Sequence, residues 1–115
     1  MSTRPEVVVA GGGAVGLAAA VAFAADGRRV RLLMPEPAPQ TPEESYDLRV
    51  YALSPANIDW LQELGVWPRV LRHCPYRRMS VWADSLSDAL DFDCGDAVAP
   101  ALGDIIEHGV LMHAL

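Results

Sequence analysis

Cysteine is scarce in this sequence of 115 residues, where Cys74 and Cys94 are the two examples. They are too few and too far apart for a zinc site or for a disulfide framework. We expect both to be free thiols in a reducing compartment, and a single bridge between them is the alternative.

Positive charge is also scarce. Nine basic residues, all of them arginine, stand against 15 Asp and Glu, and the formal net charge is -6. The basic residues are scattered, apart from the pairs Arg28–Arg29 and Arg77–Arg78. Because nucleic-acid phosphates are bound by basic surfaces, this charge balance excludes nucleic acid as a partner.

Long hydrophobic runs are missing as well. The apolar run from Val15 to Ala25 is far too short to span a bilayer, and the polar lead-in MSTRPE is unlike a signal peptide. A chain with 51% hydrophobic and 21% charged residues is typical of one globular domain. We expect a cytoplasmic protein, with peripheral attachment at the inner face of the membrane as the alternative.

Glycine, in contrast, is concentrated in the stretch VVVAGGGAVG near the N-terminus. Gly11, Gly13 and Gly16 have the spacing G-x-G-x-x-G. In dinucleotide-binding folds the first of these glycines permits a tight turn, and the second lets the backbone approach a pyrophosphate. The third lets the following helix pack close to the sheet. The sequence therefore predicts a phosphate-binding turn.

The segments around the glycines have the required order. Val7–Val9 predicts a buried strand, Ala14–Ala25 an apolar, buried helix, and Val30–Met34 a second strand. Together they predict a Rossmann-like βαβ unit, in which the free amides of Ala14 and Val15 point at the phosphates. The alternative is a glycine-rich turn that binds nothing.

One position departs from the dinucleotide pattern. An acidic residue usually follows the second strand and binds the ribose hydroxyls, but Met34 stands there, and the nearest carboxylate is that of Glu36. We expect either that Glu36 reaches back to the ribose or that backbone groups and water hold it.

The next segment, residues 35–76, combines a loop with helical structure. Four prolines predict an extended loop after the second strand. Ser54 and Pro55 predict the start of a helix that ends at Gly65. A further helical turn is expected within Trp67–Cys74.

Alternating patterns then indicate an antiparallel sheet in residues 77–106. Arg77–Asp84 and Ala89–Cys94 each alternate apolar and polar residues, which predicts a half-buried hairpin. Asp104–Ile106 predicts another short strand, and Val110–Leu115 predicts a helix within residues 107–115. The expected fold is α/β, with residues 1–34 as the dinucleotide-binding unit.

No metal site is expected. His73, His108 and His113 lack neighbouring ligands at a suitable spacing. Asp91, Asp93 and Asp96 are interpreted as the solvated face of the hairpin, because they lack the loop glycine and the bidentate glutamate of a calcium site.

Four stretches resemble the FAD-dependent aromatic hydroxylases of ubiquinone biosynthesis, the 2-polyprenylphenol hydroxylase family. The stretches are VVVAGGGAVGLAAA, DLRVYALSPANIDWLQELGVW, CPYRRMSVWADS and LGDIIEHGVLMHAL, and they follow the family's order. The resemblance implies FAD as cofactor, NADPH as co-substrate, O₂, and an aromatic polyprenyl substrate that is hydroxylated on its ring.

The resemblance also implies roles for individual residues. Gly11, Gly13 and Gly16 would hold the FAD pyrophosphate, and Arg49 would lie near the ribityl–phosphate region. His108 occupies a position where the family more often has an amide side chain close to the cofactor. Met34 replaces the family's ribose-binding glutamate. No residue is identified as a catalytic acid or base.

The chain is much shorter than the enzymes it resembles, so we expect the N-terminal, FAD-binding portion of such a monooxygenase. On this interpretation the fold is incomplete, and a C-terminal segment or an oligomeric partner is missing. Two alternatives are a non-catalytic remnant or partner-dependent module, and an NAD(P)-binding oxidoreductase domain.

Overall fold

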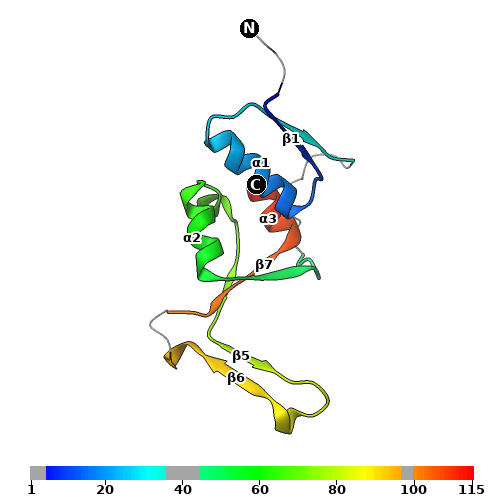
Figure 1. Ribbon diagram of the computed structural model, residues 1–115. Helices are drawn as coiled ribbons and strands as arrows, with labels where there is room; N and C mark the ends of the chain where they lie inside the picture. The colour runs from blue at the N-terminus through cyan, green and yellow to red at the C-terminus, as the bar shows by residue number, and fades with distance from the viewer. Residues whose placement is uncertain (1–4, 36–44, 97–99) are drawn as a thin grey trace.

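The computed structural model describes residues 5–35, 45–96 and 100–115, and these form a mixed α/β structure. The described part holds three α-helices and three small sheets, with strand orders β1-β2, β3-β7-β4 and β5-β6. Figure 1 shows them stacked along one axis, with β1 at one end and the β5–β6 hairpin at the other. Glu36 and the prolines at 37, 39 and 42 lie outside the described residues.

A parallel strand pair joined by a helix forms the N-terminal end. β1 (Val7–Ala10) pairs with β2 (Val30–Leu33) in parallel, with Val7 opposite Val30. Between them lies α1 (Ala14–Ala25), whose bounds are those predicted from the sequence. The helix ends at a turn in which Gly27 takes a φ of +80°, a conformation that favours glycine.

The prediction that α1 is buried on nearly every side is wrong. Leu17 is its one buried residue among those described, whereas Val15 is 85% exposed and Phe23 is 43% exposed. The physical reason is that a sheet of two strands is too narrow to cover more than one side of an apolar helix. α1 also contacts α3, and its residues Ala14 and Val21 pack against the edge of the core.

The core lies between the central sheet and two helices. β3 (Val50–Leu53) and β4 (Cys74–Tyr76) both pair antiparallel with β7 (Gly103–Glu107), which leads directly into α3 (His108–Ala114). The buried cluster combines side chains from α2 (Pro55–Glu63), β7, α3 and the α2–β4 connection. Its members are Leu61, Val66, Ile106, Val110, Leu111 and Ala114.

The predicted start of α2 is confirmed. The Ser54 hydroxyl accepts a hydrogen bond from the Asn57 N–H at 3.3 Å, and Pro55 is the first helical residue. Gly65 follows the end of the helix with a φ of +73°. The helical turn expected within Trp67–Cys74 is confirmed only for Trp67–Arg69, which form a 3₁₀ turn, because the chain then extends into β4 and pairs with β7.

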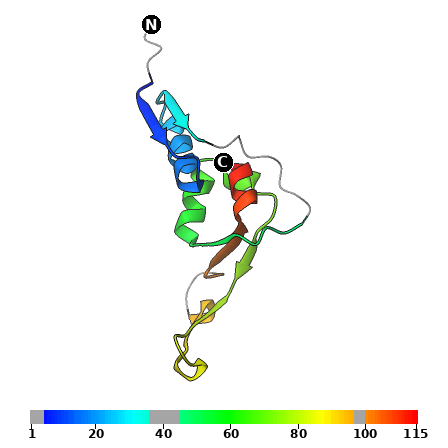
Figure 2. The same ribbon diagram turned by 90° about the vertical axis from the view of Figure 1, so that its right-hand side faces the viewer.

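The predicted hairpin is confirmed, but its predicted half-burial is wrong. β5 (Arg78–Val81) and β6 (Leu90–Asp93) pair antiparallel. Their apolar side chains on one face are 42% to 65% exposed: Met79, Val81, Leu90 and Phe92. Figures 1 and 2 both show the hairpin projecting from the rest of the chain, so no described element covers this face. The radius of gyration, 17.4 Å, accordingly exceeds the ~13 Å of a compact domain of this length.

Candidate functional site: the turn before α1 and the pocket beside it

The glycine turn between β1 and α1 is tight, for two measurable reasons. Gly11 has a φ of +133°, and its N–H donates to the Leu33 carbonyl oxygen at 2.9 Å. A Cβ added to Gly16 would lie 2.1 Å from the Gly11 carbonyl oxygen. Side chains are therefore incompatible with both positions, and the first turn of α1 packs directly on the backbone that leaves β1.

Gly13, unlike Gly16, has free space on the side where a side chain would lie. A Cβ added to Gly13 would meet nothing within 4 Å, so the space beside it is free for a ligand. Gly13 is also the N-cap of α1 and offers no side chain to the helix end. The first intrahelical bond runs from Leu17 N–H to the Gly13 carbonyl, so the amides of Ala14, Val15 and Gly16 have no partner inside the helix. Such a helix end attracts anions.

A small pocket of about 220 Å³ joins this turn to Arg49 and His108. Its lining consists of Gly12, Gly13, Pro35, Arg49, His108 and Met112. Arg49 immediately precedes β3, and His108 is the first residue of α3. The His108 N–H donates to the Arg49 carbonyl oxygen at 2.8 Å, which places the two residues side by side. Elements far apart in the sequence therefore meet at the glycine turn.

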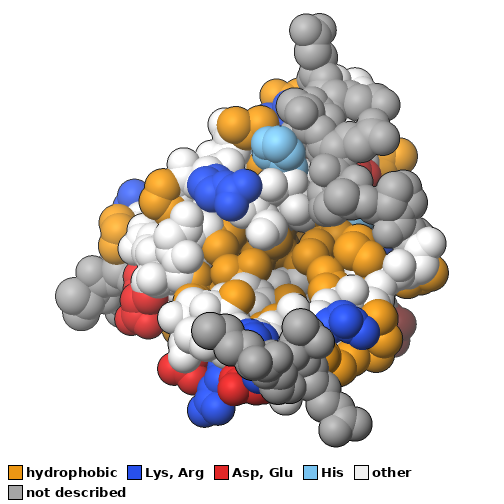
Figure 3. All heavy atoms as spheres, turned by 90° about the horizontal axis from the view of Figure 1, so that it is seen from above, with side chains coloured by type: hydrophobic (Ala, Val, Ile, Leu, Met, Phe, Trp, Pro, Cys, Tyr) orange, Lys and Arg blue, Asp and Glu red, His pale blue; other side chains and the backbone are white. Residues whose placement is uncertain are grey.

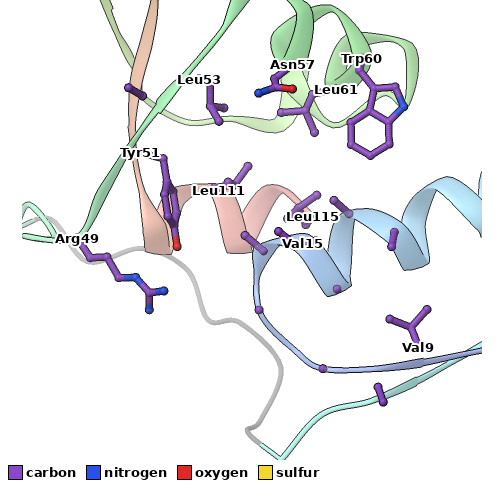
Figure 4. A pocket seen from close by; sticks show the side chains of 18 residues that line it. Val9, Val15, Arg49, Tyr51, Leu53, Asn57, Trp60, Leu61, Leu111 and Leu115 are labelled. Atoms are coloured by element: carbon purple, nitrogen blue, oxygen red, sulfur yellow. The ribbon is translucent and has the colours of Figure 1, made fainter.

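Tyr51 links the same two residues through its side chain. Its hydroxyl lies 2.8 Å from Nδ1 of His108, within hydrogen-bond distance. The Arg49 guanidinium carbon lies 5.8 Å from the centre of the Tyr51 ring, at the outer limit of a cation–π contact. In Figure 4, the Tyr51 side chain extends from β3, and the Arg49 side chain extends from the residue that precedes this strand.

A second, open pocket of about 900 Å³ continues from the turn along α1. Its lining is mostly apolar, from β1, α1, β3, α2 and α3, and includes Gly11, Gly13, Ala14, Val15, Gly16 and Arg49. Figure 4 shows Leu53, Leu61, Leu111 and Trp60 around this space. In Figure 3, hydrophobic side chains gather in the middle of the face seen from above, with Lys or Arg side chains nearby.

The charge of the two pockets is opposite to that of the whole chain. Among the described side chains that line them, none is that of Asp or Glu, and the Arg49 guanidinium is the one that is permanently charged. The chain as a whole has a formal net charge of -6. A site that combines free helix amides with an arginine and excludes carboxylates can bind an anionic group in an otherwise acidic protein.

Met34 lies against the glycine turn. A Cβ added to Gly12 would lie 2.5 Å from the Met34 Cβ, so the methionine packs on the turn at the end of β2. Its thioether is a weak hydrogen-bond acceptor, unlike a carboxylate. Of the residues singled out in the sequence, the structure brings Gly11, Gly13, Ala14, Val15, Gly16, Arg49 and His108 around these pockets, while Glu36 is outside the described residues.

A charged cluster behind Arg49 was not predicted from the sequence. Glu107, 8% exposed, accepts hydrogen bonds from Arg72 Nε at 2.5 Å and from Arg72 Nη2 at 2.8 Å. The Asp47 N–H donates to the same carboxylate at 2.7 Å. The Arg72 hydrogen bonds lower the pKa of Glu107 from 4.5 to about 2, against the opposing effect of burial. The sequence signal that could have indicated it is a glutamate directly after two isoleucines in a strand.

The two cysteines form no disulfide with each other: Cys74 is exposed, Cys94 is buried, and both are free. Within residues 5–35, 45–96 and 100–115, no three His, Cys, Asp or Glu side chains are grouped so as to hold a metal ion. None of the helices in this described part has the length and apolar character that crossing a membrane requires.

Comparison with known proteins confirms the resemblance to the ubiquinone-biosynthesis hydroxylases. The chain is 37% identical, over 119 aligned residues, to the 3-demethoxyubiquinol 3-hydroxylase of Escherichia coli (strain K12). It is 36% identical to the human mitochondrial ubiquinone biosynthesis monooxygenase COQ6 over 118 residues, and 37% identical to the mouse protein of the same name. No family model matches the chain.

These alignments cover almost all of this chain but a minor part of each relative. They include 100% of the chain and 30% of the bacterial relative, and 96% of the chain and 25% of the human one. The chain thus spans between a quarter and a third of the length of these relatives.

Proposed function

We propose that this chain is the FAD-binding portion of a flavin-dependent monooxygenase that hydroxylates an aromatic ring in ubiquinone biosynthesis. The observation that carries the proposal is the pair of adjoining pockets at the glycine turn. The smaller one joins the turn to Arg49 and His108, the larger one is lined by the first residues of α1 with their free helix amides, and no described Asp or Glu lines either pocket. The names of the relatives, which align with nearly the whole chain, supply the reaction class.

The proposed binding mode begins with the pyrophosphate. Gly11 and Gly16 shape the turn, and the open side of Gly13 leaves room for the phosphates to approach the backbone. The amides of Ala14 and Val15 would donate hydrogen bonds at the positive end of α1. In this proposal β1, α1 and β2 form a Rossmann-like unit within residues 1–34, the dinucleotide-binding part of the chain.

Arg49 and His108 would complete the site from the opposite side. Arg49 would neutralise phosphate charge near the ribityl chain, and His108 would donate a hydrogen bond to the cofactor. The apolar walls of the larger pocket would exclude water from the bound group. The ribose would be held by Glu36 or by backbone groups and water, because Met34 supplies no carboxylate.

When bound and reduced by NAD(P)H, FAD would supply the O₂-activating chemistry of ring hydroxylation. We assign binding and orientation to the residues of this chain, and no proton transfer. The proposed substrate is an aromatic polyprenylphenol, acted on by the whole enzyme. Peripheral attachment to the membrane would bring such a substrate to the enzyme.

The experiment that tests the proposal is a titration of the purified chain with FAD, in which binding is monitored by the fluorescence of the flavin. Wild-type chain should retain FAD after desalting, and Arg49→Ala should weaken binding by about tenfold to a hundredfold, as expected for a charge-assisted phosphate contact. Arg69→Ala is the matched control, since Arg69 is an exposed arginine in the 3₁₀ turn and lines neither pocket. Equal binding by both variants would contradict the proposal.

Competition with NAD⁺ separates this function from an NAD(P)-binding oxidoreductase domain. Both dinucleotides carry a pyrophosphate, so the glycine turn alone does not discriminate them. The FAD assignment predicts that NAD⁺ in large excess leaves the flavin bound, whereas displacement of the flavin by equimolar NAD⁺ would favour the alternative.

A second candidate function is a module that is non-catalytic by itself and depends on a partner. The observation that favours it is the exposed apolar surface of Val15 on α1 and of Phe92 on the hairpin. It predicts that far-ultraviolet circular dichroism shows little folded structure in the isolated chain. A cooperative unfolding transition without a partner would contradict it.

A further inference from the structure

Glu107 is a buried carboxylate in a place where burial must be compensated. It is the one charged residue classed as buried among those the structure describes, and it closes β7 immediately before α3. Arg72 meets both carboxylate oxygens, at 2.5 Å and 2.8 Å, and the Asp47 N–H adds a third hydrogen bond at 2.7 Å. A buried charge satisfied in this way fixes the segments that carry its partners.

Asp47 extends this cluster toward the pocket. Its Oδ1 accepts the Arg49 N–H at 2.9 Å, and its Oδ2 accepts the Gly109 N–H at 3.3 Å in the first turn of α3. The carboxylate therefore joins the strand entry at Arg49 to the start of the helix that carries His108. The His108 N–H in turn donates a hydrogen bond to the Arg49 carbonyl oxygen, so that the two segments are also joined directly.

We propose that Asp47 and Glu107 are positioning residues that hold Arg49 and His108 together in the wall of the pocket of about 220 Å³ beside the glycine turn. This inference rests on the proposed FAD site. Neither carboxylate lines the pocket with the glycine turn, so neither would touch the cofactor. Each acts through hydrogen bonds to the backbone, which fix the position of the main chain at Arg49 and at His108.

The physical basis is the cost of ordering a long side chain. Arg49 is exposed and leads into a short strand of four residues. Without the Asp47 carboxylate its N–H loses its acceptor, and α3 loses an acidic group at its N-terminal end. FAD would then have to order both elements on binding, and that cost would appear as lower affinity.

A double-mutant cycle tests the inference, with FAD affinity as the readout. Asp47→Asn keeps the size of the side chain but leaves one acceptor oxygen for the two N–H donors of Arg49 and Gly109, and it should raise the Kd for FAD about tenfold in the wild-type background. In the Arg49→Ala background the same substitution should have a much smaller effect, because the residue it positions is absent. Glu107→Gln should show the same non-additivity and serves as the second variant if Asp47→Asn unfolds.

Asp93→Asn is the matched control. Asp93 also accepts a backbone N–H two residues ahead, from Gly95 at 2.8 Å, and pairs with Arg78 at 3.3 Å in the distant hairpin. It should leave the Kd unchanged. Equal losses from Asp47→Asn with and without Arg49 would overturn the inference while leaving the FAD site intact. Absence of FAD binding by the wild-type chain would instead overturn the proposed function, and the inference with it.

Discussion

The backbone N–H of His108 donates to the carbonyl oxygen of Arg49 at 2.8 Å, and this bond joins the start of α3 to the entry of β3. It continues the β3–β7 ladder, in which Val50 lies opposite Glu107, by one residue. The pairing brings two side chains that are distant in the sequence to one wall of a pocket, facing the glycine turn. Four predictions follow from this arrangement and from the core beneath it.

Gly16→Ala should damage the turn before α1. Its Cβ would lie 2.1 Å from the Gly11 carbonyl oxygen, a backbone atom that cannot move without displacing β1 or α1. Thermal unfolding should show a loss of about 1 to 3 kcal/mol, in the range of overpacking, and FAD retention should fall. Gly109→Ala is the control, since its Cβ would make an ordinary 3.7 Å contact in α3. An unchanged unfolding midpoint for Gly16→Ala would contradict this geometry.

Glu107→Gln should change how stability depends on pH. The Arg72 hydrogen bonds lower the pKa of Glu107 in the folded state to about 2, from 4.5. A carboxylate with a depressed folded-state pKa stabilises the fold above its unfolded pKa, and this contribution is lost as pH falls from about 4.5 toward 2. The variant should therefore be less stable than wild type at neutral pH, and the gap should narrow over that acid range. Urea titrations at several pH values measure the difference in unfolding free energy between the two proteins. A difference that stays constant with pH would contradict the lowered pKa of Glu107.

Met34→Glu should strengthen FAD binding. Met34 packs on Gly12 at the end of β2, where a carboxylate could accept hydrogen bonds from ribose hydroxyls. The Kd for FAD should fall about tenfold, which corresponds to one good charge-assisted hydrogen bond. Met34→Gln is the control for size and should give a smaller gain. Weaker binding by the glutamate variant would place the ribose elsewhere.

Ile106→Ala should destabilise the chain far more than Phe92→Ala. Ile106 is 1% exposed in the centre of the core, and truncation there costs about 2 to 5 kcal/mol. Phe92 is 47% exposed on a hairpin face that no described element covers, so its truncation should cost little. Denaturant unfolding of both variants measures the difference. Similar losses would show that the hairpin face is covered in solution.

Several local elements were predictable because their causes are local. Ala14–Ala25 is an alanine-rich segment between a glycine turn and Gly27, and the predicted bounds match the structure. Ser54 and Pro55 supply a side-chain cap and a preset φ, which are sufficient to start α2. The alternation in β5 and β6 was recognised for the same reason, since the period of a strand is written in its own residues.

Burial was not predictable from the same patterns. The apolar composition of a helix predicts that other elements bury it. How much of it is buried depends on the width of the neighbouring sheet, and the two strands β1 and β2 leave Val15 exposed. The hairpin face is exposed for a similar reason. The helical turn expected up to Cys74 was wrong past Arg69, because pairing with β7 prevailed over local helical preference.

The glycine turn, the strand before it and the helix after it could be predicted from their own residues, because spacing and backbone sterics act over a few residues. Its resemblance to the ubiquinone-biosynthesis hydroxylases also singled out Arg49 and His108. The folded arrangement brings these two residues together beside Gly13 and joins them to the hydrogen-bonded cluster of Asp47, Arg72 and Glu107. The physical reason is that strand register and a buried ion pair arise between segments far apart in the chain, which no local pattern records.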